Sequence, residues 1–219
     1  MPVISGSHNA GLPDYKVMVF IDGGYLRKKI LELSPDYKIN YPRLAHLLSQ
    51  HWKGGIAAIE PRLIRSYYYD GMPSYEQLDT MSDSVAENAM DFIDTKYRKQ
   101  KEYLDKIAKL DFFEVRKGHL ILSTKGEIYN CKNWEWRQKG VDSLIAIDMI
   151  TKAHQGQYDL GILVAGDLDF LEIVKATKNV GVRVMGAYFP KNINPELANS
   201  FDKKYVLDKT TLLDGKIIY

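Results

Sequence analysis

Four aspartates occupy positions from which carboxylates could gather at one site. Asp22 ends the apolar run VMVFID, Asp167 and Asp169 follow the apolar run GILVAG, and Asp142 stands at the predicted start of a helix. Two carboxylates about 4 Å apart repel by roughly 4 kcal/mol at an effective dielectric of 20, so a cluster needs protons or cations. Hard oxygen ligands favour Mg²⁺ or Mn²⁺, and such ions activate water for attack on a phosphodiester. The four aspartates therefore predict a metal-dependent hydrolase.

Other chemistries find less support in the sequence. It contains no GxSxG elbow, no GxxxxGK[ST] phosphate loop, and five histidines without HExxH spacing. The DxD element of Asp167 and Asp169 also suits a nucleotide-sugar transferase, but that function gives Asp22 and Asp142 no role. A haloacid-dehalogenase-like phosphatase needs an acid where Gly24 stands. Each aspartate alone is more often a turn or cap residue, so the prediction depends on all four together.

Alternating strand and helix patterns would position these carboxylates. We expect strands in KVMVFID, RLIRSYYYDG, FFEVRKG, DLGILVAG and VRVMGAYF, and helices over residues 23–33, 41–51, 83–110, 142–154 and 168–179. The segment LILSTKGEIYNC predicts a β-hairpin insertion that turns at Lys125 and Gly126. Such alternation indicates an α/β three-layer sandwich with a mainly parallel central sheet. Ligands of such sheets gather at the carboxyl ends of the strands, where Asp22 and Asp167 are expected.

Composition and charge set the broad class. With 219 residues, of which 45% are hydrophobic, the chain is long enough for one domain, expected over residues 16–219 after a flexible lead-in of residues 1–15. No apolar run reaches the roughly 20 residues of a membrane span, the start lacks a secretory signal, and Cys131 is the only cysteine. We expect a cytoplasmic protein and read Cys131 as structural. The net charge of +2 is too small to indicate nucleic-acid binding by itself, and we interpret the basic runs at 27–29 and 96–101 as solvated faces.

Three segments in this order resemble the NYN-domain family, in its LabA-like branch of the PIN-like nuclease superfamily: FIDGGYLRK, KGVDSLIAIDM and ILVAGDLDFLEIVKATKNVGVRV. The resemblance implies a PIN-like fold, cleavage of RNA with Mg²⁺ or Mn²⁺, and catalytic metal ligands at Asp22, Asp142, Asp167 and Asp169. Two departures stand out. The Asn often found shortly after the first Asp is absent where Gly24 and Tyr25 stand, and Ala165 replaces the usual Ser or Thr. Neither departure removes a carboxylate, so metal binding should survive even with slow turnover.

The resemblance implies RNA as the partner, and we expect this RNA to be single-stranded. We expect no association with a membrane. Arg137, Lys139 and Trp136 precede Asp142 and could meet a phosphate and stack on a base; Trp134 or Trp136 could equally be a core residue. We expect Tyr67, Tyr68 and Tyr69 to pack, and Asp148 to be structural rather than a metal ligand. The alternative function is a catalytically weak or inactive PIN-like module that binds RNA or protein. The sequence leaves homo-oligomerisation open.

Overall fold

A single sheet organises the molecule. The computed structural model describes residues 14–52, 60–81, 83–123 and 134–219. Its sheet has 7 strands in the order β4-β3-β2-β1-β5-β6-β7, and every neighbouring pair is parallel except β3 and β4. The strands are β1 (Asp14–Asp22), β2 (Glu60–Pro73), β3 (Phe113–Ser123), β4 (Glu135–Lys139), β5 (Leu160–Val164), β6 (Arg183–Tyr188) and β7 (Lys203–Val206).

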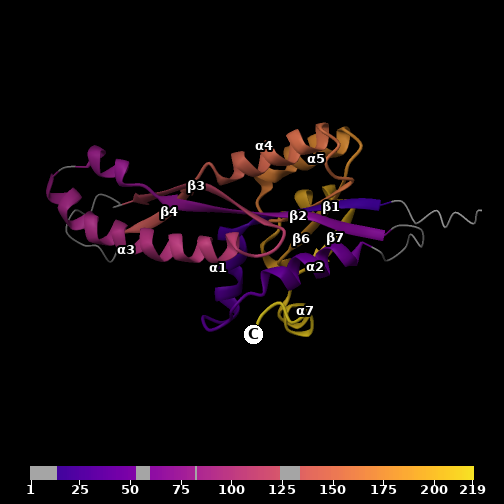
Figure 1. Ribbon diagram of the computed structural model, residues 1–219, viewed down its shortest axis with the longest axis horizontal. Helices are drawn as coiled ribbons and strands as arrows, with labels where there is room; N and C mark the ends of the chain where they lie inside the picture. The colour runs from indigo at the N-terminus through magenta and orange to yellow at the C-terminus, as the bar shows by residue number, and fades with distance from the viewer. Residues whose placement is uncertain (1–13, 53–59, 82, 124–133) are drawn as a thin grey trace, which may run out of the picture.

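Helices cover both faces of this sheet, as Figure 1 shows. The α-helices are α1 (Gly23–Leu33), α2 (Tyr41–His51), α3 (Asp83–Ala108), α4 (Val141–His154), α5 (Leu171–Asn179), α6 (Pro195–Ser200) and α7 (Lys209–Asp214), and the 3-10 turns are η1 (Tyr75–Thr80), η3 (Leu168–Phe170) and η4 (Pro190–Asn192). Buried side chains of α1, α2, α3 and α7 pack on one face, and those of α4, α5 and α6 pack on the other. The predicted α/β fold with a mainly parallel sheet and two helical layers is thus observed.

The central strand explains why the sequence chooses this architecture. In β1, Val17, Val19 and Ile21 join the core under α1 and α2, whereas Met18 and Phe20 join the core under α4. Because side chains alternate across a strand, a strand buried on both faces must be apolar at every position. The run VMVFI therefore belongs at the centre of the sheet, and it stops at Asp22.

The strand order places a reversal point beside Asp22. From β1 the chain adds β2, β3 and β4 on one side, and α4 then returns it to β5 on the other side of β1. In doubly wound sheets ligands bind outside the carboxyl ends of the strands at this reversal point. The fold therefore predicts a ligand site at the carboxyl ends of β1 and β5.

Several predicted boundaries need adjustment. The expected helix from Leu168 is in fact the turn η3 followed by α5, and the weakly patterned C-terminal segment holds α6, β7 and α7. The hairpin turn at Lys125 and Gly126 and Cys131 lie outside the described residues, as does nearly all of the predicted lead-in 1–15; β1 already begins at Asp14. None of the helices in the described part of the chain combines the length and apolarity that a membrane span requires.

Candidate active site

Asp22 lies where β1 passes directly into α1. Its carboxylate caps the helix, because Oδ1 accepts the backbone N–H of Tyr25 at 3.0 Å. The start of α1 lies close to neighbouring side chains at both glycines that follow. A Cβ on Gly23 would lie 2.2 Å from the Tyr68 ring, and one on Gly24 would lie 2.4 Å from Oε1 of Gln138. The glycines therefore let the helix start against β2 and β4 and fix Asp22 at the carboxyl edge.

Asp167 and Asp169 follow the neighbouring strand. β5 pairs with β1 in the register Ile21 to Val164, so the two strands end side by side. Asp167 then caps η3, and its carboxylate accepts the backbone N–H of Asp169 at 3.3 Å. Both side chains are exposed. The predicted pair therefore lies next to Asp22 along the sheet edge, with its carboxylates open to solvent.

Asp142 reaches the same region from the opposite direction. It lies in the first turn of α4, whose N-cap Gly140 has φ 78°, a left-handed conformation that favours glycine. Burial is the largest cause of its raised pKa, and the charges of Asp167 and Asp169 add to it. The start of α4 therefore faces the loop after β5.

Electrostatic coupling links all four predicted aspartates. Asp22 is only 8% exposed, and burial raises its pKa to about 6. The charges of Asp142 and Asp70 contribute to this rise, whereas the Tyr25 amide opposes it. Asp22 thus interacts with Asp142, and Asp142 interacts with the Asp167 and Asp169 pair. The structure brings the predicted residues together within the range of their mutual repulsion.

The four predicted carboxylates differ from two other acids of this region in their lack of cationic partners among the described residues. Within the described ranges, no Lys, Arg or His forms an ion pair with Asp22, Asp142, Asp167 or Asp169. Asp148 instead accepts hydrogen bonds from Tyr69 Oη at 2.9 Å, Arg116 Nε at 3.2 Å and Lys152 Nζ at 2.8 Å. Asp148 therefore ties α4 to β2 and β3, which is the structural role expected of it.

Asp70 is a fifth acid at this edge that the sequence interpretation did not include. It is 1% exposed on β2, one residue beyond the partner of Asp22, and Arg27 Nη2 lies 2.5 Å from its Oδ2. Its carboxylate also accepts hydrogen bonds from the Gly71 amide at 2.8 Å and from Gln138 Nε2 at 3.2 Å. The signal was present: YYYDG repeats the pattern of FIDGG, with an acid and a glycine after a buried strand.

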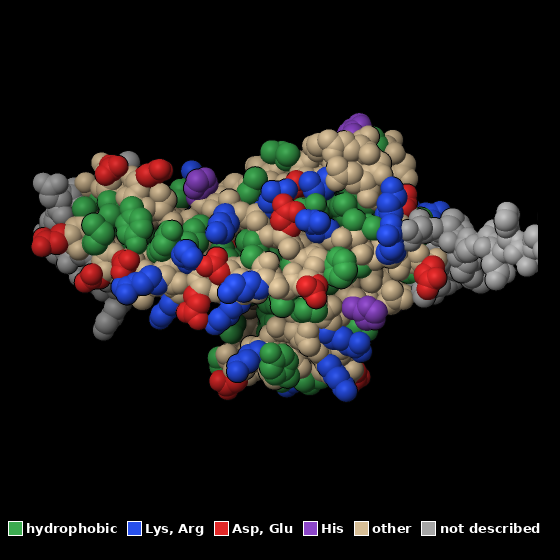
Figure 2. Space-filling model, viewed as in Figure 1, with side chains coloured by type: hydrophobic (Ala, Val, Ile, Leu, Met, Phe, Trp, Pro, Cys, Tyr) green, Lys and Arg blue, Asp and Glu red, His purple; other side chains and the backbone are tan. Residues whose placement is uncertain are grey.

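The residues predicted to contact RNA divide into two groups. Trp134 is 5% exposed in a small core with α3, and the Trp136 ring stacks on Phe92 at 5.9 Å. Arg137 and Lys139 are exposed on β4. The tryptophans are thus engaged in packing, whereas the two cations remain available to a ligand. On the face shown in Figure 2, Lys and Arg side chains are interspersed with Asp and Glu, in keeping with the small net charge.

Comparison with known proteins identifies the family. The NYN domain family model matches residues 16–208. The chain belongs to the NYN domain family. NYN domains are generally nucleases of the PIN-like superfamily. A Vibrio parahaemolyticus protein of unknown function has a similar fold, with a TM-score of 0.54 and 19% identity over 89% of this chain and 94% of the other. Among curated proteins, none matches this NYN domain.

The acidic edge of this NYN domain suits a hard cation by its chemistry rather than by a preformed cage. Among the described residues, no group of three or more His, Cys, Asp or Glu side chains is arranged to hold a metal ion. Coulombic coupling acts over longer distances than coordination, so the carboxylates repel one another without sharing a ligand position. Their donors are all oxygens, their charges lack cationic partners within the described ranges, and three of them are exposed. These properties fit Mg²⁺ or Mn²⁺.

Proposed function

We propose that this NYN domain is a divalent-metal-dependent nuclease that hydrolyses phosphodiester bonds in single-stranded RNA. Asp22, Asp142, Asp167 and Asp169 would hold Mg²⁺ or Mn²⁺ and form the catalytic centre. The observation that carries the proposal is the contrast among the acids of this region. Asp70 and Asp148 have arginine partners, whereas the four assigned acids have none in the described part of the chain.

This contrast has a direct energetic meaning. A buried or clustered carboxylate without a cation is unfavourable, as the raised pKa values of Asp22 and Asp142 show. A fold that needed only stability would pair these acids with a cation, as it pairs Asp70 with Arg27. Divalent cations bound there would supply neutralisation, water activation and stabilisation of the leaving oxygen. The protein's own contribution is to hold Asp22 rigidly at the end of β1 while the exposed carboxylates adjust around it.

RNA is proposed as the substrate from the family and from the local cations. Arg137 and Lys139 on β4 precede Asp142 by a few residues and are exposed, so they could meet phosphates beside the acids. The motifs FIDGGYLRK, KGVDSLIAIDM and GDLDF further support membership of the LabA-like branch.

The test is cleavage of an end-labelled single-stranded RNA with Mn²⁺, Mg²⁺ or EDTA. We expect cleavage with either metal, none with EDTA, and loss of cleavage in Asp167→Asn. The matched control is Asp214→Asn, an exposed aspartate of α7 that should cleave like the wild type. Equal cleavage by Asp167→Asn, or cleavage in EDTA, would refute the assignment. Single-stranded DNA and double-stranded RNA in parallel reactions test the substrate class.

A second candidate is a binding module of low or no catalytic activity. The absence of a preformed ligand group among the described residues favours it, as does Ala165 in place of the hydroxyl residue usual before GDxD. Under this function RNA binds with or without metal and remains intact. The same assay, followed by recovery of the bound RNA, separates the two candidates.

A further inference from the structure

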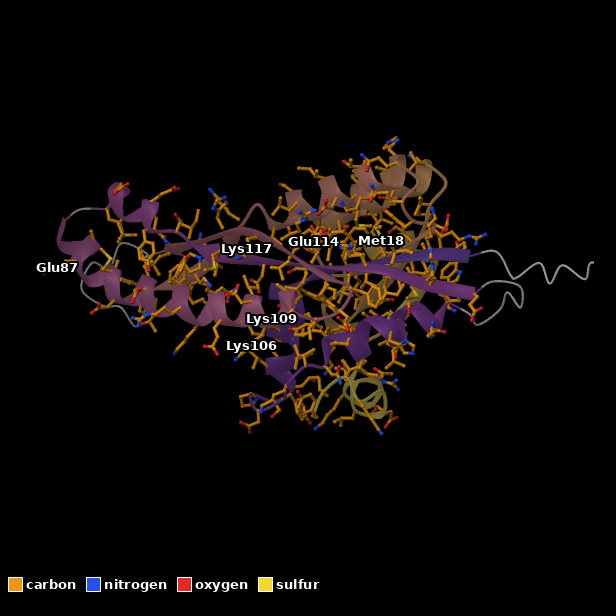
Figure 3. All side chains as sticks on the ribbon, viewed as in Figure 1. Met18, Glu87, Lys106, Lys109, Glu114 and Lys117 are labelled. Carbon is orange, nitrogen blue, oxygen red and sulfur yellow. The ribbon has the colours of Figure 1, made fainter. Side chains whose placement is uncertain are left out.

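Two adjoining hollows lie beside the acidic edge. One is an open groove of about 550 Å³ lined by Gly24, Arg27, Lys28, Leu31, Glu32 and Lys96. The other is a cavity of about 490 Å³ between α1, the end of α3 and the C-terminal residues, and Lys106, labelled in Figure 3, stands at its α3 side. Arg27 and Leu31 line both hollows. The groove reaches Gly24, two residues after Asp22, so the hollows continue from the predicted catalytic edge.

Two lysines of the groove have no carboxylate partner among the described residues. Its acid, Glu32, already accepts Lys29 Nζ at 2.8 Å, and Arg27 is paired with Asp70. In the ranges that the structure describes, neither Lys28 nor Lys96 forms an ion pair with a carboxylate. Burial and the neighbouring Arg27 lower the pKa of Lys96, and the charge of Asp70 opposes this shift. The groove therefore offers two cations to an anion, as a phosphate group requires.

The cavity has the lining of a site for a flat aromatic group. Four of its residues are tyrosines, at positions 37, 41, 103 and 219, and aliphatic side chains of α1 and α3 complete the wall. The Arg27 guanidinium lies over the Tyr103 ring at 4.7 Å, and its buried Nε has no hydrogen-bond partner in the described part of the chain. Aromatic rings and an arginine plane stack on nucleobases regardless of sequence. The volume lies within the roughly 300–1,000 Å³ of small-molecule pockets.

We propose that the groove and the cavity together form a nucleotide subsite for the substrate strand. A phosphate flanking the bond to be cut lies against Lys28 and Lys96, and the base of that nucleotide enters the tyrosine-lined cavity. This inference rests on the proposed nuclease function, because the strand must pass the acidic edge. It specifies a single strand, since a base can enter the cavity only when it is unpaired and unstacked.

The binding experiment scans abasic positions through a fluorescein-labelled single-stranded RNA of fixed length. Affinity is measured by fluorescence anisotropy with Mn²⁺ on Asp167→Asn protein, which should leave the RNA intact. We expect an abasic site at one position to weaken binding about tenfold. Adding Tyr37→Ala should weaken binding of the complete RNA similarly and remove the sensitivity to that abasic position. Tyr37→Phe keeps the ring and should behave like the unsubstituted background.

A second variant covers the case in which Tyr37→Ala disturbs folding. Leu31 is 52% exposed and lines both hollows, so Leu31→Glu should leave the fold intact and repel the nucleotide. The matched control is Leu213→Glu, at a 41% exposed leucine of α7. For the groove, Lys28→Ala should reduce the magnitude of the slope of the logarithm of the binding constant against the logarithm of salt concentration by about 0.7. Lys204→Ala on the edge strand β7 should leave that slope unchanged.

The outcomes separate this inference from the proposed function. If the wild type cleaves RNA but no abasic position matters, the subsite is wrong and the nuclease stands. An abasic sensitivity that persists in both Tyr37→Ala and Leu31→Glu also overturns the subsite, because the base then binds elsewhere. If the scan gives the expected pattern and the wild type does not cleave, the subsite stands and the nuclease assignment fails. Absence of both binding and cleavage overturns both.

Discussion

Replacement of Asp22 by Asn should make the metal-free protein more stable at neutral pH. In the folded protein, burial and neighbouring acids raise the pKa of Asp22 from 3.8 to about 6. Each pKa unit corresponds to about 1.36 kcal/mol, so the charged form costs the fold roughly 3 kcal/mol above pH 7. Asn removes this charge and can still accept the Tyr25 N–H as a helix cap. A gain of that size raises the melting temperature by roughly 6–12 °C in a chain of this length.

The sign of the pH dependence follows from the direction of the shift. Between about pH 4 and pH 6 the unfolded chain has released the Asp22 proton, whereas the folded protein still holds it. The wild type therefore loses stability as pH rises through this window and stays less stable above it. The advantage of Asp22→Asn should be absent near pH 4, grow up to about pH 6 and remain constant at higher pH.

Urea unfolding in EDTA at several pH values between 4.5 and 8 measures this difference. Asp148→Asn serves as the matched control, because its carboxylate is held by Arg116 and Lys152 and the same substitution should destabilise the fold. Addition of Mn²⁺ should narrow the gap between wild type and Asp22→Asn, since the cation stabilises only the charged site. An Asp22→Asn protein no more stable than wild type at pH 7.5, or a gain independent of pH, would contradict the reasoning.

Three further predictions concern the site and its supports. Millimolar Mg²⁺ or Mn²⁺ should raise the calorimetric melting temperature of the wild type but not that of Asp167→Asn. At ten times the dissociation constant, the bound metal adds about 1.4 kcal/mol to the free energy of unfolding. Equal melting temperatures with and without metal would count against a loaded site. Asp148→Ala should lower the unfolding free energy by about 1–3 kcal/mol in urea titrations, because Arg116, Lys152 and the Tyr69 hydroxyl lose their contacts with this carboxylate. Gly140→Ala should cost about 1–2 kcal/mol through its φ of 78° alone, since an added Cβ meets nothing within 4 Å; an unchanged stability would show that the backbone relaxes.

Local patterns in the sequence predict much of the fold. The helix predicted over residues 41–51 is observed with these bounds, and its cap Asn40 and early Pro42 act on neighbours within one turn. The run VMVFID likewise predicts a strand, and its continuous apolar character suits the central position that β1 takes with both faces buried. The C-terminal segment was less clear. Its short elements α6 and α7 have 6 residues each, too few to show a helical repeat.

Long-range pairing is what the sequence could not supply. Arg27 belongs to a basic run that we interpreted as a solvated helix face, yet its guanidinium is bound to the buried Asp70 of β2. Lys96 of the second basic run lies half-buried near the same pair. Nothing in either run indicates that α1 and α3 meet β2 at this place. The basic residues therefore matter through the tertiary fold, which local charge patterns do not encode.

The same limit applies to the acids and explains which of them the family motifs single out. FIDGG and YYYDG look equivalent in the sequence, and both aspartates end up buried beside each other at the sheet edge. They differ in their partners, because Arg27 neutralises Asp70 whereas, within the described residues, Asp22 has a helix amide and other acids around it. Burial raises the pKa of both carboxylates, but Arg27 lowers that of Asp70, whereas in the described part of the chain no cation pairs with Asp22. A buried acid at this edge without a cationic partner in the described residues is therefore the feature that a purely structural role leaves unexplained.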